Sequence, residues 1–307
     1  MPPFGASVSD TARMRSRLST YQMGMLLAFG GMLAVSLDSL GVRLTKADDW
    51  DIAFWFGIFT AIAMLLLIPI LSKQSFLAAM RADSTSVLAS GILQACSTTL
   101  FILAIGTTTV SNTVVIFAAA PVVAAVIGRV VLGEITNSRT WVGIAGSIAG
   151  VTLIVSSSAG EGRWLGDLYA VGAVMAFATN LTIWRKFPEQ NRMVAVGLSG
   201  FTMALVAWFP AHPFEMDTRA IVILAITGGV FGPGGRILVA SATRYISGSQ
   251  VGMFVPVATV AATAWAWLFL SEPAPRNTLI GGSVVLIAVW YGSRQAPIRT
   301  LTTLPEP

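Results

Sequence analysis

The stretch SNTVVIFAAAPVVAAVIGRVVLGE, at residues Ser111–Glu134, has a counterpart in SQVGMFVPVATVAATAWAWLFLSE, at residues Ser249–Glu272. A shift of 138 positions superposes the two without a gap, and the register holds for about 40 residues. Two apolar helices often match by chance, so the spaced Glu, Thr and Gly matches carry the signal. The shift pairs Leu132 with Leu270, Glu134 with Glu272, Thr140 with Thr278 and Gly143 with Gly281. The sequence therefore indicates an internal duplication.

The composition is that of an integral membrane protein. Hydrophobic residues make up 55% of the 307 positions and charged residues 11%, whereas soluble domains carry about 25% charged residues. Mean hydropathy is +0.76. The net charge is +5, but the basic residues are scattered over short loops and form no clustered face of the kind that binds nucleic acid. The single cysteine, Cys96, excludes an intrachain disulfide and a thiolate metal cluster.

Ten apolar segments are candidates to cross a bilayer, which takes about 20 residues each. They are 23–42, 53–71, 85–105, 111–132, 139–157, 166–184, 193–210, 219–240, 248–270 and 277–293. The first follows three arginines and resembles a signal peptide, but it is long enough to span and matches part of the sixth, so we expect it to be retained.

Four regions follow from this division. Residues 1–22 are predicted to be a cytoplasmic segment, 23–157 the first five-helix repeat, 158–293 the second repeat, and 294–307 a cytoplasmic tail.

The loops predict an orientation. With the N-terminus inside, twelve Lys and Arg residues fall in cytoplasmic segments and four in outer loops, which is the bias expected of cytoplasmic loops. Both termini are therefore predicted to be cytoplasmic. Because each half has an odd number of spans, the second half enters the membrane from the opposite side. The predicted fold is an all-α integral membrane protein with two inverted five-helix repeats, an architecture of secondary transporters.

Three polar residues inside the spans are candidates for substrate binding, because polar groups in a bilayer are costly and by default mark a site. Asp38 is the only carboxylate well inside a span; the alternative is a local pair with Arg43 or Lys46 at the interface. Gln94 lies near the middle of the third span, and Asn180 is the repeat counterpart of Asp38 in the sixth. Such amides either join helices or line a cavity.

The string GGVFGPGGR, residues 228–236, is the most unusual in the chain. Five glycines and a proline within a span predict a break or kink that frees backbone groups, and interrupted spans point to a substrate site. Gly232, Pro233 and Gly234 are therefore predicted to act in gating. Arg236 either snorkels to the cytoplasmic surface or offers its guanidinium to an anionic group.

Other residues within or at the ends of the spans also suggest specific roles. Pro121 and Pro256 lie in spans four and nine, 135 residues apart and so out of register with the repeat; they are hinges or tolerated kinks. Trp265 lies deeper than the tryptophans at span ends, so it is a candidate cavity residue, with belt or lipid contact as the alternative. Glu134 and Glu272 are predicted to cap the helices that follow them.

Two other classes of membrane protein fit poorly. An intramembrane enzyme needs a catalytic set, but the chain has no His-Glu-x-x-His motif, no histidine within a span and one in-span acid. A channel needs a polar stripe or filter, and the in-span polar groups are too few. We expect no metal and no cofactor.

The Leu-Gly-Glu of residues 132–134 and the Leu-Ser-Glu of residues 270–272 each end a Pro-containing span and precede a Gly-rich one. In a chain of two five-helix halves, this pattern resembles the drug/metabolite transporter superfamily, over nearly the whole chain from Met23 to Gly292. Within it the chain is similar to the ten-helix EamA-type metabolite exporters, and among these to the YddG-type amino-acid exporters. Ser271 departs from the usual Gly.

The resemblance implies a basket of helices around a central cavity, and export of amino acids or related metabolites across the inner membrane by alternating access. We expect a monomer that moves its substrate down a gradient. A carrier for nucleotide sugars, drugs or lipids is the alternative, as is a proton-coupled antiporter that uses Asp38.

Overall fold

The computed structural model describes residues 20–72, 76, 80, 81, 84–108, 113, 116–155, 164–270 and 276–293. These residues form helices and turns, with no β-strand among them, so the predicted all-α fold is confirmed. The first half contributes α2 (Thr20–Thr45), α3 (Asp49–Ser72), α5 (Ser84–Thr107), α7 (Ala120–Leu132) and α8 (Ser138–Val155). The beginning of the predicted fourth span, and Glu272, lie outside the described residues.

The second half begins with α9 (Trp164–Lys186) and α10 (Arg192–Ala207), followed by the short turn η1 (Pro213–Glu215). One span is then built from α11 (Thr218–Ile226), η2 (Thr227–Phe231) and α12 (Gly232–Ala242), and the next from α13 (Gly248–Gly252) and α14 (Val255–Leu270). The last helix is α15 (Arg276–Ser293). Each half therefore supplies five spans.

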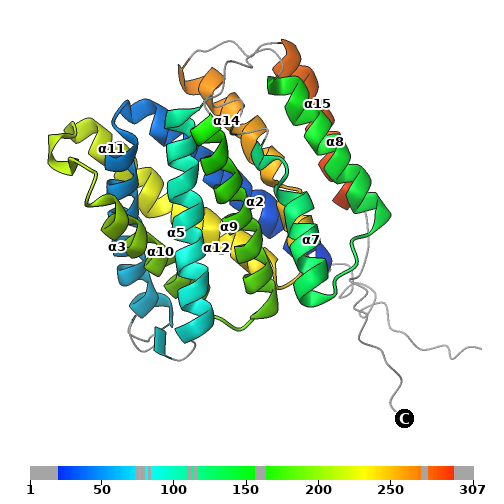
Figure 1. Cartoon of the computed structure of the whole chain (residues 1–307), viewed down its shortest axis with the longest axis horizontal. Helices are drawn as coiled ribbons and strands as arrows, with labels where there is room; N and C mark the ends of the chain where they lie inside the picture. Colours follow the sequence, from blue (N-terminus) through cyan, green and yellow to red (C-terminus); the bar gives the residue numbers. More distant parts are fainter. Residues whose placement is uncertain are drawn as a thin grey trace, which may run out of the picture.

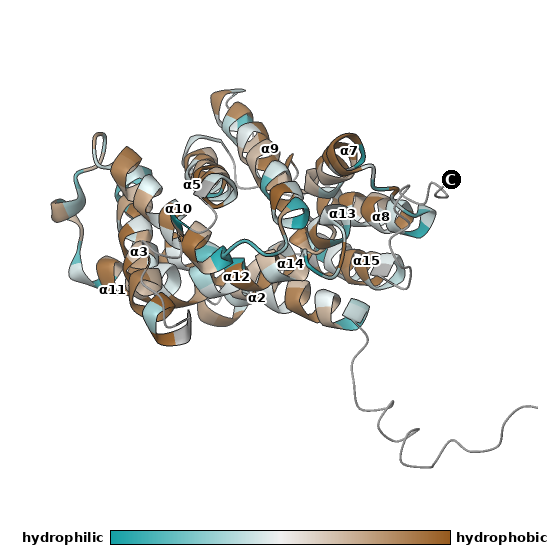
Figure 2. Ribbon diagram, turned by 90° about the horizontal axis from the view of Figure 1, so that it is seen from below, coloured by the Kyte–Doolittle hydropathy of each residue, from teal (hydrophilic) through white to brown (hydrophobic). Residues whose placement is uncertain are grey.

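The outer surface of the bundle is apolar, as a bilayer requires. Among the described residues, six helical segments are long and apolar enough to cross a membrane. On α3, Leu66 and Ile70 are 63% and 71% exposed, as expected of side chains that face lipid. Figure 2 shows hydrophobic residues over most of the helices and hydrophilic ones concentrated near helix ends and connections.

The helices pair in a pattern that is the same for both halves. α2 packs against α12, and its repeat counterpart α9 packs against α5, the counterpart of α12. α3 packs against α10, and α8 packs against α15, so each of these helices contacts its own counterpart. In Figure 1 the α8–α15 pair lies at one edge, α3 and α10 lie toward the other, and α2, α5, α9 and α12 lie between them.

Spans four and nine are both interrupted just before a proline. Turns at residues 118–119 and 253–254 precede α7 and α14, and Pro121 and Pro256 are the second residues of these helices. A proline fits there because the first turn of a helix has no intrahelical partner for its N–H groups. The two prolines thus occupy corresponding places, contrary to the interpretation from the fixed shift. Their spacing differs because α7 has 13 residues and α14 has 16.

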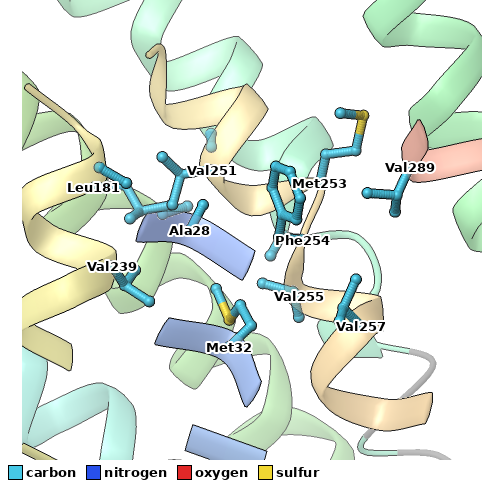
Figure 3. Packing of buried hydrophobic residues seen from close by; sticks show 14 of the residues in the cluster. Ala28, Met32, Leu181, Val239, Val251, Met253, Phe254, Val255, Val257 and Val289 are labelled. Carbon is cyan, nitrogen blue, oxygen red and sulfur yellow. The ribbon is translucent and has the colours of Figure 1, made fainter. Parts of the chain in front are cut away.

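The two interruptions meet inside the bundle. A Cβ atom at Gly252, the last residue of α13, would lie 3.0 Å from the Cα of Pro121, so the two segments are in close backbone contact here. Around this point lies the largest buried apolar cluster. Figure 3 shows its side chains converging from several elements: Ala28 and Met32 of α2, Leu181 of α9, Val239 of α12, and Met253 and Phe254 of the turn.

The glycine-rich span is distorted without being unwound. Its backbone stays helical through a π-helical turn, η2, in which the N–H of Gly232 donates to the carbonyl of Thr227. Gly232 therefore does not bond the carbonyl of Gly228, and the hydroxyl of Thr60 on α3 donates to that carbonyl at 2.7 Å. The predicted disturbance thus takes the form of a π turn, and a hydroxyl from a neighbouring helix satisfies the freed carbonyl.

Candidate substrate site

A connected chain of polar side chains crosses the middle of the bundle, from α2 to α12, α5 and α9. It contains four of the residues predicted from the sequence, namely Asp38, Arg236, Gln94 and Asn180, and one that was not predicted, Thr98.

Asp38 and Arg236 form its ion pair. Nη1 of Arg236 donates to Oδ2 of Asp38 at 3.1 Å, and the two side chains are only 11% and 14% exposed, respectively. Arg236 therefore does not snorkel to the membrane surface, and the partner of Asp38 is not Lys46; the side chain of Arg43 lies outside the described residues. A paired charge is tolerated where a lone one is not, because each ion offsets the other's desolvation.

Close packing of α2 on α12 brings the pair together. A Cβ at Gly31 would lie 2.9 Å from the carbonyl oxygen of Gly235, so these two helices touch backbone to backbone. Gly31 and Asp38 are two turns apart on α2, on the same face. The neighbour of Gly235 is Arg236, so the glycine crossing sets the approach of the two charged residues.

Phe56 and Gly232 complete the surroundings of the guanidinium. The Cζ of Arg236 lies 5.0 Å from the ring centroid of Phe56 on α3, within cation–π range. A Cβ at Gly232 would lie 2.6 Å from the tip of that ring, 2.7 Å from Nη1 of Arg236 and 3.1 Å from Oδ1 of Asp38. A side chain at this position would force the ring, the guanidinium or the carboxylate to move.

The amide end of the chain joins α5 to α9. Nη2 of Arg236 and Nε2 of Gln94 both donate to the hydroxyl of Thr98, at 3.4 and 3.2 Å. Gln94 and Thr98 are one turn apart on α5, so both point to the same side. Nδ2 of Asn180, on α9, donates to Oε1 of Gln94 at 3.1 Å. Gln94 therefore joins α5 to α9, which is one of the two roles that the sequence leaves open for it.

Two buried hydrogen-bond acceptors in this line of polar side chains have no donor among the described residues. They are Oδ1 of Asp38 and Oδ1 of Asn180, both with essentially no solvent-accessible area. A buried acceptor that is left without a hydrogen bond costs about 1–3 kcal/mol. A group that supplies N–H donors, such as an ammonium, would remove this cost.

Trp265 contacts the same helix as Asp38. Its Nε1 donates to the hydroxyl of Ser36 at 2.8 Å, and Ser36 lies two residues before Asp38 on α2.

The residues predicted to act in gating do not lie together. Pro121 and Pro256 lie at the two helix interruptions, and Pro233 is buried at the start of α12. A Cβ at Gly234 would meet no atom within 4 Å.

At the end predicted to be cytoplasmic, a second ion pair joins the halves. Nε of Arg185 donates to Oε1 of Glu134 at 3.0 Å, and its Nη1 donates to the carbonyls of Thr243 and Arg244. The predicted capping role of Glu134 is wrong, because its carboxylate is taken up by Arg185. Asn137 accepts the hydrogen bond at the start of α8 instead.

The chain matches known proteins at the level of family and fold. The model of the EamA-like transporter family matches twice, over residues 22–156 and 164–293. No curated protein matches the sequence. A solved structure titled only "Crystal structure of protein" is similar with a TM-score of 0.71 at 14% identity, and the match covers 88% of this chain and 96% of that one. At this identity the likeness concerns the fold alone.

The family match, the duplicated five-helix halves and the apolar surface agree with one another. The chain belongs to the EamA-like transporter family of the drug/metabolite transporter superfamily and is a multi-pass membrane transporter.

Proposed function

We propose that this protein exports small zwitterionic metabolites, in the first place amino acids, across the cell inner membrane by alternating access. The observation that carries the proposal is the Asp38–Arg236 pair, in which the carboxylate keeps one buried acceptor without a donor. In an amino acid a cationic and an anionic group lie close together. The carboxylate would bind the fork of Arg236, and the ammonium would bind Oδ1 of Asp38.

The charge of the site supports this class over the alternatives. A nucleotide sugar carries two negative charges on its diphosphate, and a cationic drug carries an unbalanced positive charge. Asp38 and Arg236 neutralise each other, so the site offers no surplus charge to either ligand. A net-neutral solute with both signs of charge matches the site without leaving a buried ion unpaired.

We propose downhill transport and cytoplasmic termini, as the sequence predicts. The charge of Asp38 is balanced by a guanidinium, so neutrality of the site inside the membrane requires no proton. The end with Glu134 and Arg185 faces the cytoplasm in this orientation, in agreement with the distribution of Lys and Arg over the loops.

The proposal is tested by uptake into proteoliposomes that contain the purified protein. Labelled amino acids are compared with a nucleotide sugar and a cationic drug, each at matched concentration. We expect uptake of one or more amino acids above protein-free liposomes, and none of the other two solutes. Uptake of nucleotide sugars alone would reverse the assignment.

The same preparation tests the energy source when a pH gradient is imposed. With and without the pH gradient, amino-acid uptake should approach, and not exceed, the equilibrium distribution. Accumulation above equilibrium that follows the pH gradient and disappears in Asp38→Asn would favour a proton-coupled antiporter instead.

A further inference from the structure

Asp38 and Arg236 contact each other directly, so the site is neutral whenever no solute lies between them. Nη1 of the arginine bonds one carboxylate oxygen at 3.1 Å, and both side chains are largely buried. Phe56 and Thr98 hold the rest of the guanidinium. All of these partners belong to the protein itself.

Neutrality matters because a carrier that alternates between two open states must pass through a closed one. A charge that is shut away from water without a partner is strongly unfavourable, whereas a paired charge is tolerated. Only states in which the central charges are paired will therefore reorient quickly.

We infer that the Asp38–Arg236 pair is an exchangeable counter-ion, which lets the carrier reorient without substrate and so makes net export independent of counter-transport. The inference rests on the proposed function, because it concerns a zwitterion that inserts between the two residues. Each residue exchanges its protein partner for one end of the solute, and the central charges stay paired in both states.

This exchange of partners predicts how the carrier behaves when only one of the two charged residues is present. In Asp38→Asn the cation of Arg236 has no counter-ion in the empty carrier, but a monocarboxylate without an ammonium supplies one. The loaded carrier then reorients and the empty one does not. In Arg236→Met the roles are reversed, and an amine without a carboxylate restores neutrality to Asp38. Each variant should exchange its solute across the membrane but fail to move it in one direction only.

The experiment measures two rates in proteoliposomes loaded with labelled solute. Exchange is efflux into a medium that contains the same unlabelled solute, and net flux is efflux into a medium without it. For the native protein and an amino acid, the two rates should agree within about threefold. For Asp38→Asn with the des-amino acid, and Arg236→Met with the des-carboxy amine, net flux should fall roughly tenfold or more below exchange, because an unpaired buried charge is strongly destabilising. Arg236→Lys keeps the pair and should keep the native ratio, whatever its absolute rate.

Three results would overturn the inference: native exchange with no net flux, a native ratio in either single variant, or loss of all exchange in both variants although they elute as folded protein. The last would mean that the pair is needed for binding alone. Absence of exchange for every amino acid in the native protein is a different result, since it would overturn the proposed function itself.

Discussion

At the scale of single residues, Gly232 is the position where the site has least room. The ring of Phe56, the guanidinium of Arg236 and the carboxylate of Asp38 all lie within 3.1 Å of where its Cβ would be. Overpacking of this kind costs about 1–3 kcal/mol, and 1.4 kcal/mol corresponds to about tenfold in an equilibrium. We expect Gly232→Ala to lower amino-acid transport in proteoliposomes by about tenfold.

Gly30 supplies the matched control, because it lies on α2, which packs against α12, and has nothing within 4 Å of its Cβ position. Gly30→Ala should transport within about twofold of the native protein, since substitutions without new contacts usually change the free energy by no more than about 0.5 kcal/mol. Equal activity of the two variants would show that the crowding at Gly232 has no consequence for transport.

The same scale shows why only part of the site could be predicted. Asp38, Gln94, Asn180 and Arg236 are recognisable in the sequence, because polar side chains inside a bilayer are rare and costly. Thr98 gives no such signal. Threonine is common in apolar helices, where its hydroxyl can bond the backbone of its own helix, so its part in the chain depends on the contact between α5 and α12.

At the scale of elements, the π-helical turn η2 depends on a residue from another helix. Thr60 on α3 is buried, and its hydroxyl donates to the carbonyl of Gly228. Thr60→Val keeps the shape and removes the donor. A buried polar group left unsatisfied costs about 1–3 kcal/mol, so the variant should unfold at a lower temperature in detergent than Thr60→Ser, which keeps the hydroxyl.

If the valine variant were as stable as the serine variant, water or another group would have to satisfy Gly228. The dependence on Thr60 also explains why the sequence predicted a disturbed helix without predicting its form. The glycines and proline of residues 228–236 predict a disturbed helix. Whether it unwinds or forms a π turn is decided by a donor 168 positions away in the chain, which no local pattern contains.

At the scale of the whole molecule, the duplication in the sequence predicted the two five-helix halves, and the motifs at residues 132–134 and 270–272 carried the resemblance to the family. The way the halves close on each other could not be predicted. Gly252 packs on Pro121 where the two interrupted spans cross, and the hydroxyls of Thr136 and Ser249 approach to 3.5 Å. These contacts join residues of different types in the two halves, so aligning one half with the other does not reveal them.

The Glu134–Arg185 pair also joins the two halves, and we expect a transport cycle by alternating access to break such contacts when this end opens. Glu134→Gln keeps the volume and removes the charge. A change of about 1 kcal/mol shifts a two-state population about fivefold. In a Cys96→Ala background, a cysteine placed at the buried Ser249 should react about fivefold faster with a membrane-impermeant maleimide applied from the cytoplasmic side when Glu134→Gln is present. Glu189→Gln, at an exposed acid between α9 and α10, should leave the rate unchanged. Equal rates in both variants would mean that the ion pair does not hold this end closed.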